Sequence, residues 1–160
     1  MILCNLALEL EPLIGKQRVD ELLPQVIHEV MDVFYQPASG LILENVNLDG
    51  SFCDSFEGRV LNPGHTIEAM WFIMDLGVRQ NDTALIHKAK DIMLHTLQMG
   101  WDKEFGGIFY FLDCQGHPTQ QLEWDQKLWW VHVEALVALA KGYKLTGDVQ
   151  CAQWFEKVHQ

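Results

Sequence analysis

His65 and Glu68 are the residues whose types and spacing are best suited to acid–base chemistry. They lie three positions apart in Asn-Pro-Gly-His-Thr-Ile-Glu-Ala (residues 62–69), which opens an apolar segment. Asn62 is a good helix cap and Pro63 is tolerated in a first turn, so the sequence predicts a helix that begins here. Side chains three apart share one helix face, and the ordinary pKa of histidine lies near neutral pH. The pair indicates a proton-transfer site; the structural alternative is a histidine that only binds a backbone carbonyl near the cap.

Glu134 is the second acidic residue of interest, because it lies in an otherwise apolar helical segment, a few residues after Trp129 and Trp130. Burying a carboxylate is costly unless it is paired or lines a wet cavity. Aromatic faces beside carboxylates bind sugars by stacking while the acids take the hydroxyls, although such tryptophans can also be core residues. His132, two positions from Glu134, points in another direction and is predicted to be structural.

Arg59, just before residues 62–69, could orient a polar substrate or pair with Glu57. The His-x-x-Glu spacing could also supply two metal ligands. Because no third histidine or carboxylate stands at a suitable spacing, the sequence predicts no metal site.

Hydrophobic periodicity and helix end signals predict the elements that position these residues. Two long connections, 36–62 and 100–126, are each expected to contain a short strand, at Leu41–Val46 and Ile108–Leu112. The predicted helices are 2–14, 18–35, 63–77, 83–99, 127–146 and 148 to the end.

An internal repeat relates the two halves of this pattern. The aligned segments are Gly40–Gly50 with Gly106–Gly116 and Ile67–Ala69 with Val133–Ala135, each offset by 66 positions (106 − 40 and 133 − 67). Helix pairs that repeat in this way must stack on their neighbours to bury their apolar faces. We therefore expect an all-α toroid or solenoid of three helix hairpins in a single domain (1–160), with the long loops on one rim. Glu68 and Glu134 should face the same cavity.

Composition excludes several functional classes. The chain has 160 residues, 49% of them apolar, and a net charge of −11, which argues against a nucleic-acid partner. It has no run of about 18 apolar residues and no basic segment at its start, so neither a membrane span nor a signal peptide is expected. Cys4, Cys53, Cys114 and Cys151 lie far apart without a Cys-x-x-Cys pair, which indicates a reduced, cytoplasmic protein.

Three ordered motifs give the sequence a specific resemblance. They are Gly-Arg at 58–59 with Asn-Pro-Gly-His-Thr-Ile-Glu-Ala-x-Trp-Phe at 62–72, Gly-Trp-Asp-x4-Gly-x-Phe-Tyr-Phe-x-Asp at 100–113, and Leu-Glu-Trp-x2-Lys-Leu-Trp-Trp-x-His-x-Glu-Ala at 122–135. In these motifs the chain resembles the N-acylglucosamine 2-epimerase family, also known as renin-binding proteins.

The resemblance implies an (α/α)6 barrel of six helix hairpins. It also implies a reaction in which proton transfer at C2 of the sugar interconverts N-acetylglucosamine and N-acetylmannosamine. His65 matches one of the family's two catalytic histidines, and Glu134 matches its functional glutamate. Glu68, Trp129 and Trp130 match sugar-contacting positions, to which we add Arg59. No cofactor is required, and ATP is an effector rather than a substrate in this branch.

The chain departs from the family pattern in length. Three hairpins are expected where the barrel has six, and neither the second catalytic histidine nor the N-terminal catalytic arginine is matched; His159 does not stand in the family motif. The chain is therefore expected to be a central piece of an epimerase, inactive alone, that forms a homodimer or associates through open barrel edges. Alternatives are a non-catalytic sugar- or protein-binding module and an epimerase of mannose or cellobiose. A glycosidase is a third, if Glu68 and Glu134 approach within about 5–9.5 Å.

Overall fold

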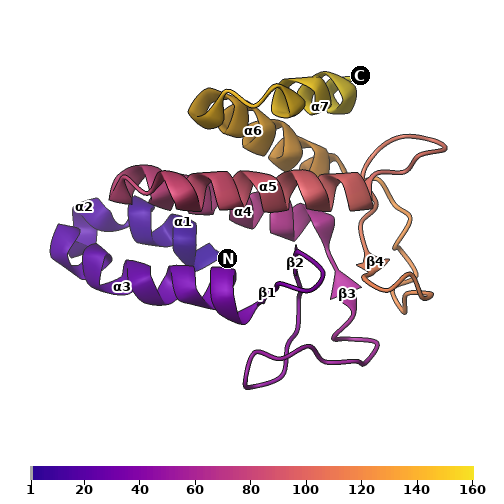
Figure 1. Ribbon diagram of the computed structural model, residues 1–160, viewed down its shortest axis with the longest axis horizontal. Helices are drawn as coiled ribbons and strands as arrows, with labels where there is room; N and C mark the ends of the chain where they lie inside the picture. Colours follow the sequence, from indigo (N-terminus) through magenta and orange to yellow (C-terminus); the bar gives the residue numbers. More distant parts are fainter. Residues whose placement is uncertain (1) are drawn as a thin grey trace.

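The computed structural model describes residues 2–160 as a row of antiparallel helix hairpins (Figure 1). The central hairpin consists of α4 (Pro63–Gln80) and α5 (Thr83–Gly100). On one side α4 packs against α6 (Trp129–Thr146), which pairs with α7 (Val149–His159), and on the other side it contacts α1 (Ile2–Glu9). The predicted all-α architecture of three stacked hairpins is confirmed.

The first hairpin is less regular than its sequence predicts. The single helix expected over 2–14 is wrong, because α1 ends at Glu9 and a separate short helix, α2 (Glu11–Ile14), follows. Pro12 lies in the first turn of α2, where its missing N–H is tolerated, whereas inside a longer helix it would break a hydrogen bond. The partner helix α3 (Lys16–His28) continues into a π-helical turn, η1 (Glu29–Val33).

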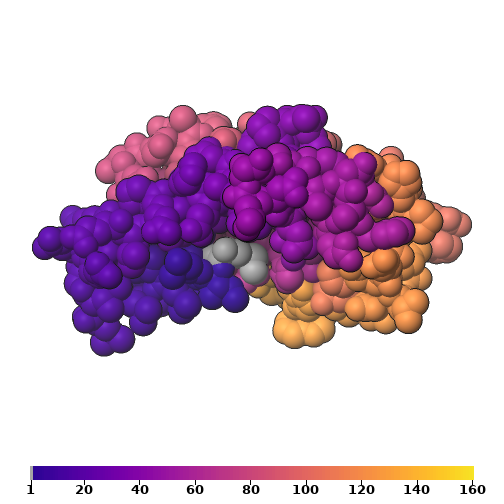
Figure 2. Space-filling model, turned by 90° about the horizontal axis from the view of Figure 1, so that it is seen from below, coloured from indigo at the N-terminus to yellow at the C-terminus, as the bar shows by residue number. Residues whose placement is uncertain are grey.

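The strands are shorter than predicted, and one pairing joins the two long loops. β1 (Tyr35–Gln36) and β2 (Leu41–Ile42) form a hairpin, as expected of the first loop. β3 (Val60–Leu61), however, pairs antiparallel with β4 (Leu112–Asp113) of the second loop, while Ile108, where the sequence predicts the strand of that loop to begin, forms only an isolated antiparallel bridge with Trp101. Both loops therefore lie side by side at one rim, which Figures 1 and 2 show from two directions.

The internal repeat relates α4 to α6 over their full length and α5 to α7 at their start. Shifting α4 by 66 positions gives the bounds of α6 (129 − 63 and 146 − 80). The caps repeat as well: Asp82 and Asp148 cap the following helices, while Asn81 and Gly147 end the preceding ones in the left-handed conformation. The repeat inferred from two short segments thus extends over all of α4 and α6 and into the helices that follow them.

One hydrophobic core runs between the helices and leaves apolar side chains exposed at both ends of the row. The largest fully buried side chains from the central hairpin are Ile67, Met70, Ile73, Met74, Leu76, Met93 and Leu97. Exposed apolar residues gather on α1 and α2 (Ile2, Leu3, Leu6, Leu13, Ile14) and on α6 (Trp129, Val133, Val137). Within residues 2–160, none of the helices has the length and apolar character needed to cross a membrane.

Replacing Asn62 with alanine should destabilise the start of α4. Asn62 is fully buried, and its side-chain oxygen accepts a hydrogen bond from the His65 N–H at 3.0 Å. Losing this cap is expected to lower the free energy of unfolding by about 1 kcal/mol, measured by urea denaturation. Asn62→Ser keeps an acceptor and should recover most of the loss; equal losses in both variants would contradict the capping role.

Candidate functional site

His65 projects from the first turn of α4 and binds a carboxylate from the first long loop. Its Nδ1 lies 3.2 Å and 3.1 Å from Oε1 and Oε2 of Glu44. The hydrogen bond to Glu44 raises the pKa of His65. Burial acts in the opposite direction, and the negative charges of Glu44 and Glu68 add to the rise. The sequence reasoning missed Glu44. The one local sign of Glu44 in the sequence is that an acidic residue directly follows the apolar run Leu41–Leu43.

Trp130 supplies an aromatic face beside His65. The two ring centroids are 5.6 Å apart with the planes tilted by 34°, and Tyr110 meets Trp130 edge-on at 6.2 Å. Gly64 allows this approach, because a Cβ there would lie 2.7 Å from Cη2 of Trp130. Trp129, in contrast, is 77% exposed, since consecutive helix positions point about 100° apart. The structure thus brings Trp130 to His65, while a substrate contact for Trp129 stays a prediction.

Glu68 and Glu134 lie on the packed helices α4 and α6, and the charge of Glu134 acts on the pKa of Glu68, while a cavity shared by the two stays a prediction. Burial raises the pKa of Glu68, and the negative charge of Glu134 raises it further, while His65 lowers it. The Trp71 indole N–H donates to Oε2 of Glu134 at 2.7 Å. Glu68 therefore has a raised pKa beside Glu134, which is itself bound by Trp71.

Glu134→Gln is expected to lower the pKa of Glu68 toward its ordinary value, because the neighbouring negative charge is removed while an acceptor for Trp71 remains. With its raised pKa, Glu68 contributes stability at low pH that is lost as pH rises through the folded-state pKa, so the variant should lose less stability over that range. Carboxyl-carbon NMR titration of Glu68 checks the shift. Glu156→Gln on α7 is the control, because Glu156 is exposed and is not among the charges that shift Glu68.

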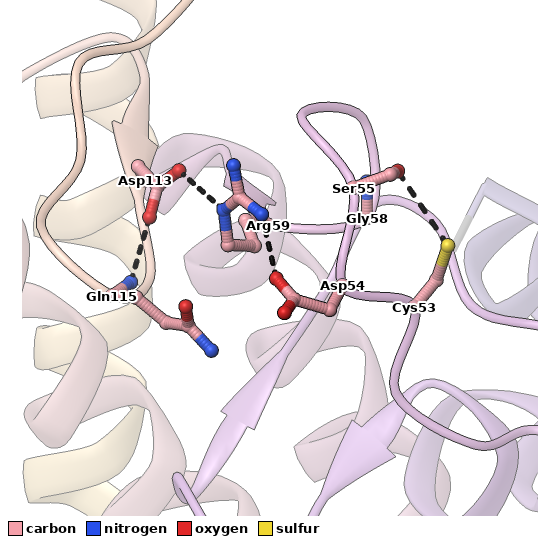
Figure 3. Close-up of polar contacts among 7 residues, drawn as sticks. All are labelled: Cys53, Asp54, Ser55, Gly58, Arg59, Asp113 and Gln115. Carbon is pink, nitrogen blue, oxygen red and sulfur yellow. Dashed lines mark hydrogen bonds and ion pairs between the residues drawn. The ribbon is translucent and has the colours of Figure 1, made fainter.

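Arg59 joins the two loops by pairing with Asp54 and Asp113, and not with Glu57, which is one of the two alternatives that the sequence leaves open. Its Nε donates to Oδ2 of Asp113 at 2.9 Å and a terminal nitrogen donates to Oδ1 of Asp54 at 2.6 Å (Figure 3). Burial acts to raise the pKa of Asp113, but the bonds from Arg59 and from the Gln115 N–H outweigh it and the pKa is lowered. The guanidinium is thus engaged beside the β3–β4 pair, and its predicted contact with substrate stays a prediction.

His132 has the structural role expected of it. Its Nδ1 donates to the Leu128 carbonyl at 2.8 Å, and its Nε2 accepts from the Ile108 N–H at 3.0 Å. Because both ring nitrogens are bound to the backbone, neither is free for proton transfer.

A cavity of about 200 Å³ adjoins His65 and Glu44. The rest of its lining is Val30, Phe34, Ile42, Leu43, Thr66 and Ala69. In the described part of the chain, no three His, Cys, Asp or Glu side chains are grouped so as to hold a metal ion. The site therefore offers a histidine–carboxylate pair, an aromatic face and two further acids at the rim where the long loops meet.

Comparison with known proteins identifies the family to which the chain belongs. The model of the N-acylglucosamine 2-epimerase (GlcNAc 2-epimerase) family matches residues 1–160. The chain belongs to this family. The N-acylglucosamine 2-epimerase of Mus musculus is 41% identical over 133 residues, which cover 82% of this chain and 32% of the mouse protein. That of Rattus norvegicus is 42% identical over 119 residues, covering 74% and 28%.

Solved structures agree with the epimerase-family fold. A D-mannose isomerase matches 97% of this chain with a TM-score of 0.78 at 20% identity, and the match covers 39% of that protein. A cellobiose 2-epimerase from Bacillus thermoamylovorans also has a TM-score of 0.78 at 20% identity, covering 97% of this chain and 38% of its own. The chain thus spans about a third of the length of the mouse epimerase and has the hairpin arrangement of part of an (α/α)6 barrel.

Proposed function

We propose that this chain forms part of an isomerase that interconverts N-acetylglucosamine and N-acetylmannosamine by moving a proton at C2. The observation that carries the proposal is the position of His65, held by Glu44 and facing Trp130, in a chain of this family. A group that titrates near neutral pH is what proton abstraction beside a carbonyl requires.

In this mechanism His65 exchanges a proton with C2 of the open-chain sugar. Loss of the C2 proton gives an enediolate-like intermediate, and a proton returned to the opposite face gives the epimer. The group serving that opposite face would be the family's second histidine, which no motif of this chain matches. Trp130 would stack on the sugar, while Glu68 and Glu134 would bind its oxygens, with Glu134 orienting a histidine or the ring oxygen.

Two other functions remain as alternatives. The structural relatives include a D-mannose isomerase and a cellobiose 2-epimerase, so the sugar could be mannose or cellobiose. A non-catalytic sugar- or protein-binding module would use the same aromatic face without proton transfer. The relatives above are isomerases and epimerases, which disfavours a glycosidase built on Glu68 and Glu134.

Three further properties belong to this proposal. The four cysteines are free thiols, which suits a reducing, cytoplasmic compartment. The exposed apolar residues of α1, α2 and α6 suit association, either with a second copy or with other barrel hairpins. ATP as an effector follows from the family resemblance alone.

A chimera tests the function. In it, this chain replaces the segment that it matches in the mouse epimerase, so that the remaining hairpins are present. Incubation with N-acetylglucosamine in deuterium oxide should yield N-acetylmannosamine and deuterium at C2. Exchange only with mannose or cellobiose would support the alternative sugars. Sugar binding without any exchange would favour the binding module.

A further inference from the structure

We propose that Glu44 is the positioning residue of His65: it binds Nδ1 and thereby leaves Nε2 as the nitrogen that exchanges a proton with substrate. The proposal rests on the proposed function only for the identity of that substrate. The pairing itself can be tested without any sugar.

The geometry determines which nitrogen is occupied. Both carboxylate oxygens of Glu44 lie within 3.2 Å of the same ring nitrogen of His65. An ionised carboxylate only accepts hydrogen bonds, so Nδ1 must carry a hydrogen. In the neutral ring Nε2 is then free to take a proton, and in the charged ring the Nε2 proton is the one that can be given away.

The backbone holds the segment that carries Glu44 on both sides. The Leu43 N–H donates to the Phe34 carbonyl at 3.2 Å, and the Glu44 N–H donates to the Val60 carbonyl at 3.4 Å. The hydroxyl of Thr66, the residue after His65, donates to the Ile42 carbonyl at 3.2 Å. The loop and the first turn of α4 are therefore fixed to one another on either side of the pair, which is how a catalytic group is preorganised.

The second repeat unit has the same framework. The bridge between Tyr35 and Ile42 recurs 66 positions later between Trp101 and Ile108. The Leu43–Phe34 hydrogen bond likewise recurs from the Phe109 N–H to the Gly100 carbonyl, at 2.9 Å. The two units thus use the same backbone contacts to form this corner, where the start of each long loop turns back on the end of the preceding helix.

The charged pair is absent from the second unit. The positions equivalent to Glu44 and His65 are Tyr110 and Val131 (44 + 66 and 65 + 66). Val131 is fully buried, and Tyr110 packs against Trp130 instead. Because the fold forms this corner without a carboxylate or an imidazole, the architecture does not require the Glu44–His65 pair. We therefore assign the pair a role in the functional site and not in forming the fold.

The two carboxylates that act on the pKa of His65 act in the same direction. Glu44 faces it from the loop after β2 and Glu68 from its own helix, and both favour the protonated ring, while Glu134 on α6 acts on Glu68. The side chains of His65 and Glu44 are 39% and 29% exposed, so the pair can reach a ligand without being fully solvated. Glu44 therefore also adjusts the proton affinity of His65.

Nitrogen NMR of the histidine side chains in the 160-residue chain, recorded over a pH series, tests the proposal. In the unmodified chain, neutral His65 should carry its proton on Nδ1. Glu44→Gln should lower the pKa of His65, because the charge is lost while the shape of the side chain is kept. Asp32→Asn is the matched control: Asp32 binds Nδ1 of His28 at 3.0 Å in an exposed pair, and its loss should leave His65 unchanged.

Two results would overturn the proposal. One is a neutral His65 protonated on Nε2 in the unmodified chain, which needs no variant and so is independent of whether Glu44→Gln folds. The other is an unchanged pKa of His65 in a folded Glu44→Gln chain. A chimera that lacks C2 exchange would contradict the proposed function while leaving both NMR results as they stand.

Discussion

His65→Ala should lower the rate of C2 proton exchange by the chimera about 10²- to 10⁴-fold, which is the usual contribution of a positioned general acid or base. The cause is the loss of the nitrogen that exchanges the C2 proton, so sugar binding through Trp130 and the two acids should change much less. Deuterium incorporation at C2 gives the rate, and titration with N-acetylglucosamine gives the affinity.

His28→Ala is the matched control, because His28 also binds a carboxylate but lies exposed on α3. It should leave the exchange rate unchanged. An exchange rate that is the same in His65→Ala and in the unmodified chimera would remove His65 from the mechanism.

Gly64→Val should strongly destabilise the start of α4, costing about 3 kcal/mol of unfolding free energy, at the upper end of typical overpacking effects. A Cβ at this position would lie 2.7 Å from Cη2 of Trp130 and 2.9 Å from a methyl group of Val131. The clash must displace Trp130 from His65, so substrate affinity should fall together with stability. Urea denaturation measures the first effect and sugar titration the second.

Trp130→Ala in the Gly64→Val background checks the cause. Removing the indole relieves the main clash, so the double variant should be less destabilised than the sum of the two single changes. Additive losses would mean that Gly64 matters for a reason other than its approach to Trp130.

Local signals in the sequence predict most of the helical framework. The cap at Asn62 and the apolar period place the start of α4 correctly, and the repeat relates α4 to α6. The predicted end of α4 falls short because Asn81, which ends the helix in the left-handed conformation, carries a weaker stop signal than glycine. Pro12 divides the first helix, although the apolar pattern continues across it.

The site is predictable only where its residues share an element or a repeat. His65 and Glu68 lie on one helix, and Glu134 follows from the offset. Glu44, in contrast, meets His65 across 21 positions of chain, through a loop whose path depends on tertiary contacts. No periodicity encodes such a contact, and the same is true of the Arg59–Asp113 ion pair, which spans 54 positions.

The pairing of β3 with β4 has a consequence for how this molecule folds. β3 precedes the central hairpin and β4 precedes the next one, so the ladder and the Arg59–Asp113 bond join segments on either side of a repeat boundary. In an array held only by stacked helices, units can unfold from an end one at a time. Here, opening either hairpin at its loop end also breaks the loop contacts of its neighbour. The two hairpins that meet beside His65 are therefore expected to unfold together as one cooperative unit.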